Sequence, residues 1–222
     1  MPQVLKNKNL EIQIDFLEEG YSSSRFDWTG KITQVAFKGI TLSVSEKNET
    51  INDAEFGKGF YNEFGIDSAI GFAETAVGDW FHKIGIGLLQ KQSNEYHFHK
   101  RHNIKPAKFE VRTTASKVKI SCTSETVNSY SYRLKKEIVL LESGFGIKYN
   151  LENTGEKEIN TSEYVHNFMA IDNQLMGSDY RLKLPFQLMP ELFKETVNTE
   201  QRIVVGENEI AFKGTPNEQF FF

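Results

Sequence analysis

The chain has 222 residues, of which 39% are hydrophobic, and a formal net charge of −4 at pH 7. One core can bury most of this apolar surface, and large β domains commonly reach this length undivided, so we expect a single domain over 1–222. The basic residues are scattered and fewer than the acidic ones, 26 against 30, which argues against nucleic acid as a partner.

Cysteine usage and apolar runs indicate the cellular setting. Cys122 is the one cysteine, so no intrachain disulfide can form, and the first residues lack the apolar stretch of a secretion signal. The longest apolar runs, such as 84–89, are too short to cross a bilayer and contain two glycines. These features predict a cytoplasmic protein without a membrane segment.

Alternation of apolar and polar residues predicts a strand at 10–14 and another at 31–37. The same period resumes at 40–44 after Lys38 and Gly39, which predicts a hairpin with a tight turn. The stretch 46–71 is rich in Gly, Asn, Asp and Glu and has neither period, so we expect a long loop.

Further strands are predicted along the rest of the chain, at 109–112, 118–120, 130–134, 137–141, 145–151 and 203–205. Helical signal is sparse: one or two turns over 190–197 begin with a proline suited to a first helical position. The predicted fold is therefore all-β and antiparallel, a meander with very little helix.

Several segments together carry a family resemblance, at 24–30, 63–66, 70–72, 83–89, 149–157 and 163–168. From about Tyr21 to its end the chain resembles the galactose-mutarotase-like, or aldose 1-epimerase, family, in its bacterial epimerase-like branch. The segment around His166 is the most specific, because it is similar to the family's strand-borne histidine accompanied by Asn and an aromatic residue.

The resemblance implies a β-supersandwich whose sheets curl around a groove that holds a hexose. In such enzymes a histidine donates a proton to the ring oxygen while a carboxylate removes the proton of the anomeric hydroxyl, so that the ring opens and recloses as the other anomer. This is general acid–base catalysis, which requires no metal and no organic cofactor.

His166 is the candidate catalytic acid. Alternation along a strand would place His166, Phe168 and Ala170 on one face, and a half-buried structural histidine is the alternative interpretation. Asn167 belongs to the same motif as a candidate substrate contact, but alternation turns it to the opposite face, where it would support the neighbouring backbone.

Lys83 lies at about the place where the best-known members of the family carry a substrate-holding arginine. A lysine offers a single rotatable donor group instead of a planar fork, and an ordinary surface lysine is the alternative. Trp80 would stack on a pyranose face, and Glu74 would accept hydroxyl protons. A solvated loop with one buried tryptophan explains these two residues equally well.

His97, His99 and His102 form a cluster whose first two members would share one face of a strand, at a spacing that can chelate a metal. Lys100 and Arg101 lie between them and oppose cation binding, so we expect no metal. The resemblance implies instead that His97 or His99 is the family's second substrate-binding histidine, and the choice between them stays open.

Two interpretations concern the beginning and the end of the chain. Arg25 and Trp28 are interpreted as the opening of a core strand, with a structural role. In the family, the glutamate that acts as the catalytic base lies on strands that follow the region similar to this chain's last residues. The resemblance therefore implies that the sequence is C-terminally incomplete, and that catalytic activity depends on whether the glutamate is present. Three consecutive phenylalanines at 220–222 favour pairing with another chain, as in a homodimer.

Three hypotheses follow for the function. The first is an aldose 1-epimerase-like isomerase, and the second is a non-catalytic carbohydrate-binding β-sandwich module. The third is a self-associating structural β domain with no sugar site.

Overall fold

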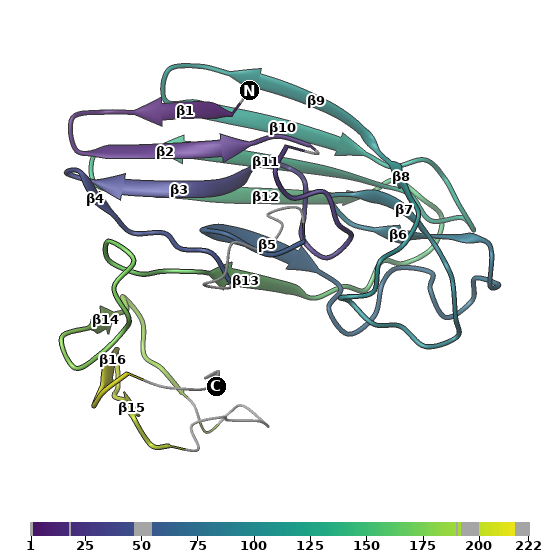
Figure 1. Ribbon diagram of the computed structural model, residues 1–222. Coiled ribbons are helices and arrows are strands. Elements are labelled where there is room, and N and C mark those ends of the chain that lie inside the picture. The colour runs from purple at the N-terminus through teal and green to yellow at the C-terminus, as the bar shows by residue number, and fades with distance from the viewer. Residues whose placement is uncertain (1, 18, 47–54, 190, 192–199, 216–222) are drawn as a thin grey trace. The chain divides into compact units, whose positions relative to one another are not determined.

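The computed structural model describes residues 2–17, 19–46, 55–189, 191 and 200–215. The chain divides into two compact units, Met1–Asp172 and Asn173–Phe222. The elements of the described residues are strands in antiparallel sheets (Figure 1), so the prediction of an antiparallel all-β fold is confirmed. None of the described segments forms a helix with the length and apolar character that a membrane crossing would require.

The described strands of the first unit form three sheets. The N-terminal sheet has the order β1-β2-β3-β5-β13, with β4 paired to β3. Its strands are β1 (Gln3–Lys6), β2 (Leu10–Asp15), β3 (Lys31–Phe37), β4 (Ile40–Thr41), β5 (Phe60–Phe64) and β13 (Glu163–Asn167). The meander sheet joins β9 (Lys108–Thr113), β10 (Lys117–Thr123), β11 (Tyr132–Leu140) and β12 (Phe145–Asn153) in sequence order. A small sheet contains β6 (Trp80–Lys83), β7 (Gly87–Gln90) and β8 (Ile104–Pro106).

The described strands of the second unit form a small sheet in the order β14-β16-β15. Its strands are β14 (Arg181–Lys183), β15 (Ile203–Val205) and β16 (Glu209–Phe212). Ile203, Ile210 and Phe212 form its buried core. The predicted turns of helix over 190–197 fall on residues of which Glu191 alone is described, and the phenylalanines at 220–222 lie outside the described residues.

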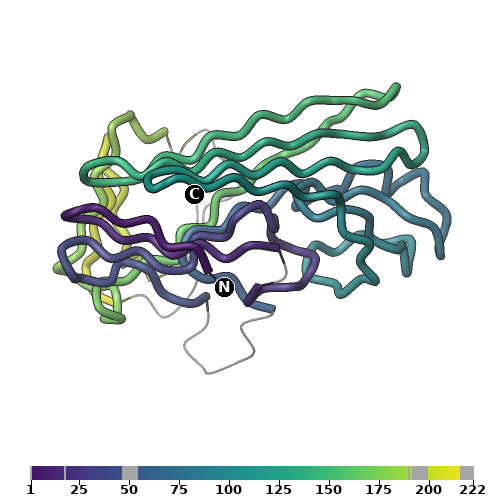
Figure 2. Tube along the Cα trace, turned by 90° about the horizontal axis from the view of Figure 1, so that it is seen from above, coloured from purple at the N-terminus to yellow at the C-terminus, as the bar shows by residue number. Residues whose placement is uncertain are grey.

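The N-terminal and meander sheets pack face to face, and Figure 2 shows them as two layers. Ile12 and Ile32 from one sheet meet Ile120 and Ile138 from the other, and all four are at most 2% exposed. Each buried side chain of this kind stabilises the fold by about 1.5–3 kcal/mol. The alternation that predicted these strands is therefore the pattern of side chains that enter this core.

The hairpin predicted at Lys38 and Gly39 is confirmed between β3 and β4. Both residues have positive φ, 50° and 84°, which is the conformation of the tight turns that match strand twist. Pairing after this turn is shorter than the predicted 40–44, since β4 ends at Thr41 and Ser43 forms an isolated bridge to Met169.

Three predictions about elements are wrong. The loop expected over 46–71 contains β5, whose buried Asn62 and Glu63 obscure the strand pattern. The strands expected at 130–134 and 137–141 are one strand, β11, because Lys136, which looks like a polar break, points into the interior. Arg25 and Trp28 open no core strand, since the segment 21–30 is irregular.

Lys136 explains how a charge is accommodated between the sheets. Its side chain is 1% exposed, and its Nζ lies 3.3 Å from Asp27 Oδ2, 3.0 Å from the Gly30 carbonyl oxygen and 3.5 Å from Asn62 Oδ1. The Tyr149 hydroxyl donates to the same Asp27 oxygen at 2.5 Å. Burial lowers the pKa of Lys136 and raises that of Tyr149. We call Lys136, Asp27, Gly30, Asn62 and Tyr149 the Lys136 cluster. Its member Asn62 lies on β5 and projects toward the meander sheet.

Candidate functional site

His166 lies on β13, which pairs with β5 at the edge of the N-terminal sheet. The register places His166 opposite Tyr61 and Tyr164 opposite Glu63. Paired residues of antiparallel strands project to the same side, so these four side chains share one face. Asn62, the residue between Tyr61 and Glu63, projects to the other face of β5, where it lies 3.5 Å from Lys136 of the meander sheet. The face that carries His166 is therefore directed away from the meander sheet.

A buried carboxylate organises this face. Glu63 Oε2 lies 3.0 Å from His166 Nε2 and 3.1 Å from Arg25 Nε. Glu63 Oε1 lies 3.8 Å from Lys83 Nζ, which is too long for a hydrogen bond and close enough for an ion pair. The Glu63 side chain is 0% exposed, against 9% for His166 and 18% for Arg25. Oε2 is held by two charge-assisted contacts, whereas Oε1 accepts no hydrogen bond from the described residues and has only the Lys83 ion pair.

Tyr96 and Glu46 bind the two cations, Lys83 and Arg25, that contact Glu63. The Lys83 side chain on β6 is 1% exposed, and its Nζ donates to the Tyr96 hydroxyl at 3.0 Å. Burial lowers the pKa of Lys83 to about 8, and the charge of Glu63 opposes that shift. Arg25 Nη1 contacts Glu46 Oε1 at 2.8 Å, so its guanidinium bridges two carboxylates.

Aromatic rings surround the imidazole. The ring centroid of His166 lies 4.5 Å from Tyr164, 5.0 Å from Phe26 and 5.7 Å from Phe168, with which it is stacked. Tyr164 is 46% exposed, so an aromatic surface beside the histidine is open to solvent. We call the group formed by Tyr164, His166, Phe168 and Arg25 the His166 patch.

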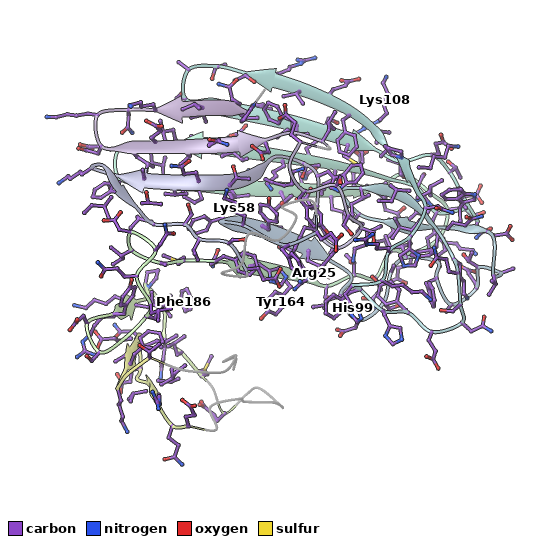
Figure 3. All side chains as sticks on the ribbon, in the orientation of Figure 1. Arg25, Lys58, His99, Lys108, Tyr164 and Phe186 are labelled. Carbon is purple, nitrogen blue, oxygen red and sulfur yellow. The ribbon has the colours of Figure 1, made fainter. Side chains whose placement is uncertain are left out.

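The patch continues from Arg25 toward the segment 91–103. The Arg25 guanidinium lies 5.0 Å from the ring centroid of Phe98, and that ring is 5.2 Å from His99. Figure 3 labels Arg25, Tyr164 and His99 on the same side of the unit. His99 is therefore linked to the patch through Phe98, whereas His97 lies 3.6 Å from the exposed Glu95; both histidines are exposed.

The structure brings together some of the residues that the sequence singled out. Glu63 joins His166 to Lys83, and Lys83 is not the surface lysine of the alternative interpretation. The strand expected to carry His97 and His99 is absent, because the described segment 91–103 is irregular, although the two rings lie 5.8 Å apart. Within the described parts of the chain, no three His, Cys, Asp or Glu side chains are grouped to hold a metal ion.

Three other candidates lie apart from Glu63. Glu74 forms an exposed ion pair with Lys157 at 2.6 Å. Trp80 opens β6 and is half-buried. Asn167 is exposed, and its partner in the ladder is Phe60, on the opposite face from His166.

Sequence reasoning missed Glu63 and Arg25. A signal for β5 is present, because 60–64 holds three aromatic residues and is flanked by Gly59 and Gly65. Both glycines have positive φ, 65° and 62°, as expected of residues that delimit a strand. Arg25 has no comparable local signal, since its role depends on a carboxylate 38 positions away.

The arrangement has a definite acid–base geometry. A neutral imidazole that donates Nε2–H to Glu63 keeps Nδ1 as its acceptor, and its protonated form donates from both nitrogens. Among the described residues, Nδ1 of His166 has no hydrogen-bond partner. Glu63 thus orients the ring and leaves the second nitrogen available to exchange a proton.

No match to the chain was found among protein-family models, curated proteins or solved structures.

Proposed function

We propose that the protein binds a hexose at the His166 patch and interconverts its anomers, as an aldose 1-epimerase-like isomerase. His166 would be the proton donor to the ring oxygen. The observation that supports this most is the 3.0 Å contact between His166 Nε2 and Glu63, a carboxylate that is itself 0% exposed. Such a pair holds a proton carrier in one orientation, as general acid–base catalysis requires.

The residues around His166 have separate roles in this proposal. Glu63 is a positioning residue, since its buried carboxylate acts through the imidazole. Tyr164 offers an exposed ring for the apolar face of a pyranose, and Arg25 offers guanidinium donors for hydroxyl groups. The β-supersandwich belongs to the same proposal, supported by two antiparallel sheets packed face to face.

One observation favours the second candidate function, a non-catalytic carbohydrate-binding module. Among the described residues, His166 has one carboxylate within hydrogen-bond reach, and that carboxylate is buried. Glu46, the other carboxylate that contacts Arg25, already accepts hydrogen bonds from Arg25 and from the Gly57 backbone amide. A site with one proton carrier can bind a sugar without accelerating its anomerisation much.

Polarimetry on freshly dissolved α-glucose and α-galactose separates these possibilities. We expect the protein to accelerate mutarotation and His166→Asn to lower the rate constant by about 100-fold or more, the usual contribution of a general acid. His102→Asn is a matched control, because His102 bonds to the Gln90 carbonyl and has no contact with Glu63. Calorimetric binding without acceleration would support the module, and neither signal would contradict both functions.

A further inference from the structure

The outer face of the meander sheet concentrates positive charge. Residues that alternate inward, such as Ile120 and Ile138, are at most 2% exposed and belong to the core. The residues between them face outward, and Figure 2 shows this sheet as an outer layer of the unit. Among the described residues of this outer face, the cationic side chains outnumber the carboxylates. The cations are Lys108, Arg112, Lys117, Lys119, Arg133, Lys135 and Lys148, and the carboxylates are Glu110, Glu137 and Glu152.

This concentration is not visible in the sequence, where each cation alternates with an inward residue. The register arranges the outward residues in rows across the strands. One row is Glu110, Ser121, Lys135 and Asn150, and the next is Arg112, Lys119, Glu137 and Lys148. Neighbouring strands are about 4.8 Å apart, so each row spans roughly 14 Å, which long side chains can bridge.

These two rows line one hollow of about 440 Å³. Its two carboxylates already have cationic partners, because Glu137 pairs with Lys117 and Lys119, and Glu110 lies 3.4 Å from Lys108. Lys136 also lines the hollow but is paired with the buried Asp27. The remaining cations of the hollow, Arg112, Lys135 and Lys148, have no carboxylate partner among the described residues. This excess occurs in a protein whose net charge is −4.

We propose that this hollow binds a small ligand that carries phosphate groups. Arg112 supplies a planar fork that matches an oxyanion, Lys135 and Lys148 supply point charges, and Ser121 and Asn150 supply neutral donors. The site is independent of the proposed isomerase function, since it lies on the meander sheet and the His166 patch faces away from that sheet.

The observations favour a small ligand over a nucleic acid. A volume of 440 Å³ is in the range of small-molecule sites. The two rows contain no aromatic side chain on which a base could stack.

Isothermal titration calorimetry with pyrophosphate, inorganic phosphate, sulfate and acetate tests the proposal. At about 0.15 M salt, where the screening length is ~8 Å, we expect saturable one-site binding with pyrophosphate tightest and acetate weakest. Lys135→Ala and Lys148→Ala should each weaken pyrophosphate binding by about tenfold, and Arg112→Lys should weaken it less than Arg112→Ala.

Arg133→Ala is the matched control. Arg133 lies on the same strand and face as Lys135, outside the hollow, and pairs with Glu152 at 3.1 Å. Its removal lowers the charge of the face equally, so pyrophosphate affinity should stay within about twofold. Absence of saturable binding, equal affinity for pyrophosphate and acetate, or an equal loss in Arg133→Ala and Lys135→Ala would each overturn the proposal.

Discussion

Replacement of Lys136 by methionine should destabilise the first unit by about 3 kcal/mol. The lysine is the cation of a buried ion pair with Asp27, with side-chain exposures of 1% and 0%. Removing one member of such a pair leaves the other charge buried and typically costs about 3–5 kcal/mol.

The structure places the expected cost at the lower end of that range. Asp27 keeps the hydroxyls of Tyr149 and Thr29 and the Thr29 amide, so its carboxylate stays hydrogen-bonded. Methionine fills most of the volume of the lysine stem, so little cavity cost is added. In a unit of this size, a loss of about 3 kcal/mol corresponds to a Tm lower by roughly 6–12 °C.

Urea unfolding followed by tryptophan fluorescence measures the change. Lys135→Met is the matched control, because Lys135 precedes Lys136 on β11 and points to solvent; it should change the free energy of unfolding by at most about 0.5 kcal/mol. Asp27→Asn combined with Lys136→Met should cost less than the sum of the single changes by about 1.5 kcal/mol or more. If the two lysine variants were equally stable, the assigned ion pair would contribute nothing and the reasoning would be refuted.

Three further predictions concern other buried groups. Burial lowers the pKa of Lys31 and Lys83 from 10.5 to about 8, so above pH 8 the unfolded chain binds more protons than the folded one. The free energy of unfolding should therefore rise between pH 8 and 9, by up to about 1.4 kcal/mol per lysine, and urea titrations should show a smaller rise in Lys31→Met. Cys122 is 0% exposed, and burial raises its pKa to about 12, so a thiol reagent should label it only after unfolding; rapid labelling of the folded protein would contradict the burial. Gly59 has a φ of 65°, and a Cβ there would lie 2.3 Å from the Ile32 carbonyl oxygen. Gly59→Ala should therefore lower the free energy of unfolding in urea by about 2 kcal/mol or more. Gly144→Ala is the control, because a Cβ there meets nothing within 4 Å, and it should leave that free energy unchanged.

Alternation predicted strands wherever apolar side chains enter the core and polar ones face water. It succeeded at β2, β3, β9 and β12 and located the hairpin at Gly39. It failed where polar groups face inward, because Asn62, Glu63 and Lys136 interrupt the pattern without interrupting the strands. A single sequence does not reveal which polar residues have buried partners.

The candidate site divides in the same way. His166 and Lys83 stand in recognisable segments, but they meet only through Glu63, which lies 103 positions from the histidine and 20 from the lysine in the chain. Arg25 completes the cluster from an irregular segment that no periodicity describes. These contacts are tertiary, so local pattern can indicate the residues but not their association.

Buried lysines connect the fold to the site. Lys31, Lys83, Lys91 and Lys136 are each at most 4% exposed among the described residues, and every one donates to backbone carbonyl oxygens of irregular or turn segments. The carbonyls belong to Leu17 and Tyr21, to Gly65, to Phe72 and Thr75, and to Gly30, respectively. Such segments have no ladder to satisfy their buried carbonyls, and an ammonium group supplies three donors at once.

The placement of these lysines also bears on the rigidity of the His166 patch. Arg25 lies in the segment between Tyr21 and Gly30, whose two ends are held by Lys31 and Lys136. Because both ends of this irregular segment are hydrogen-bonded, it has fewer conformations than a free loop. It therefore loses less conformational entropy when Glu63 and Glu46 order Arg25. The buried cations thus hold in place the irregular chain on which the exposed part of the patch depends.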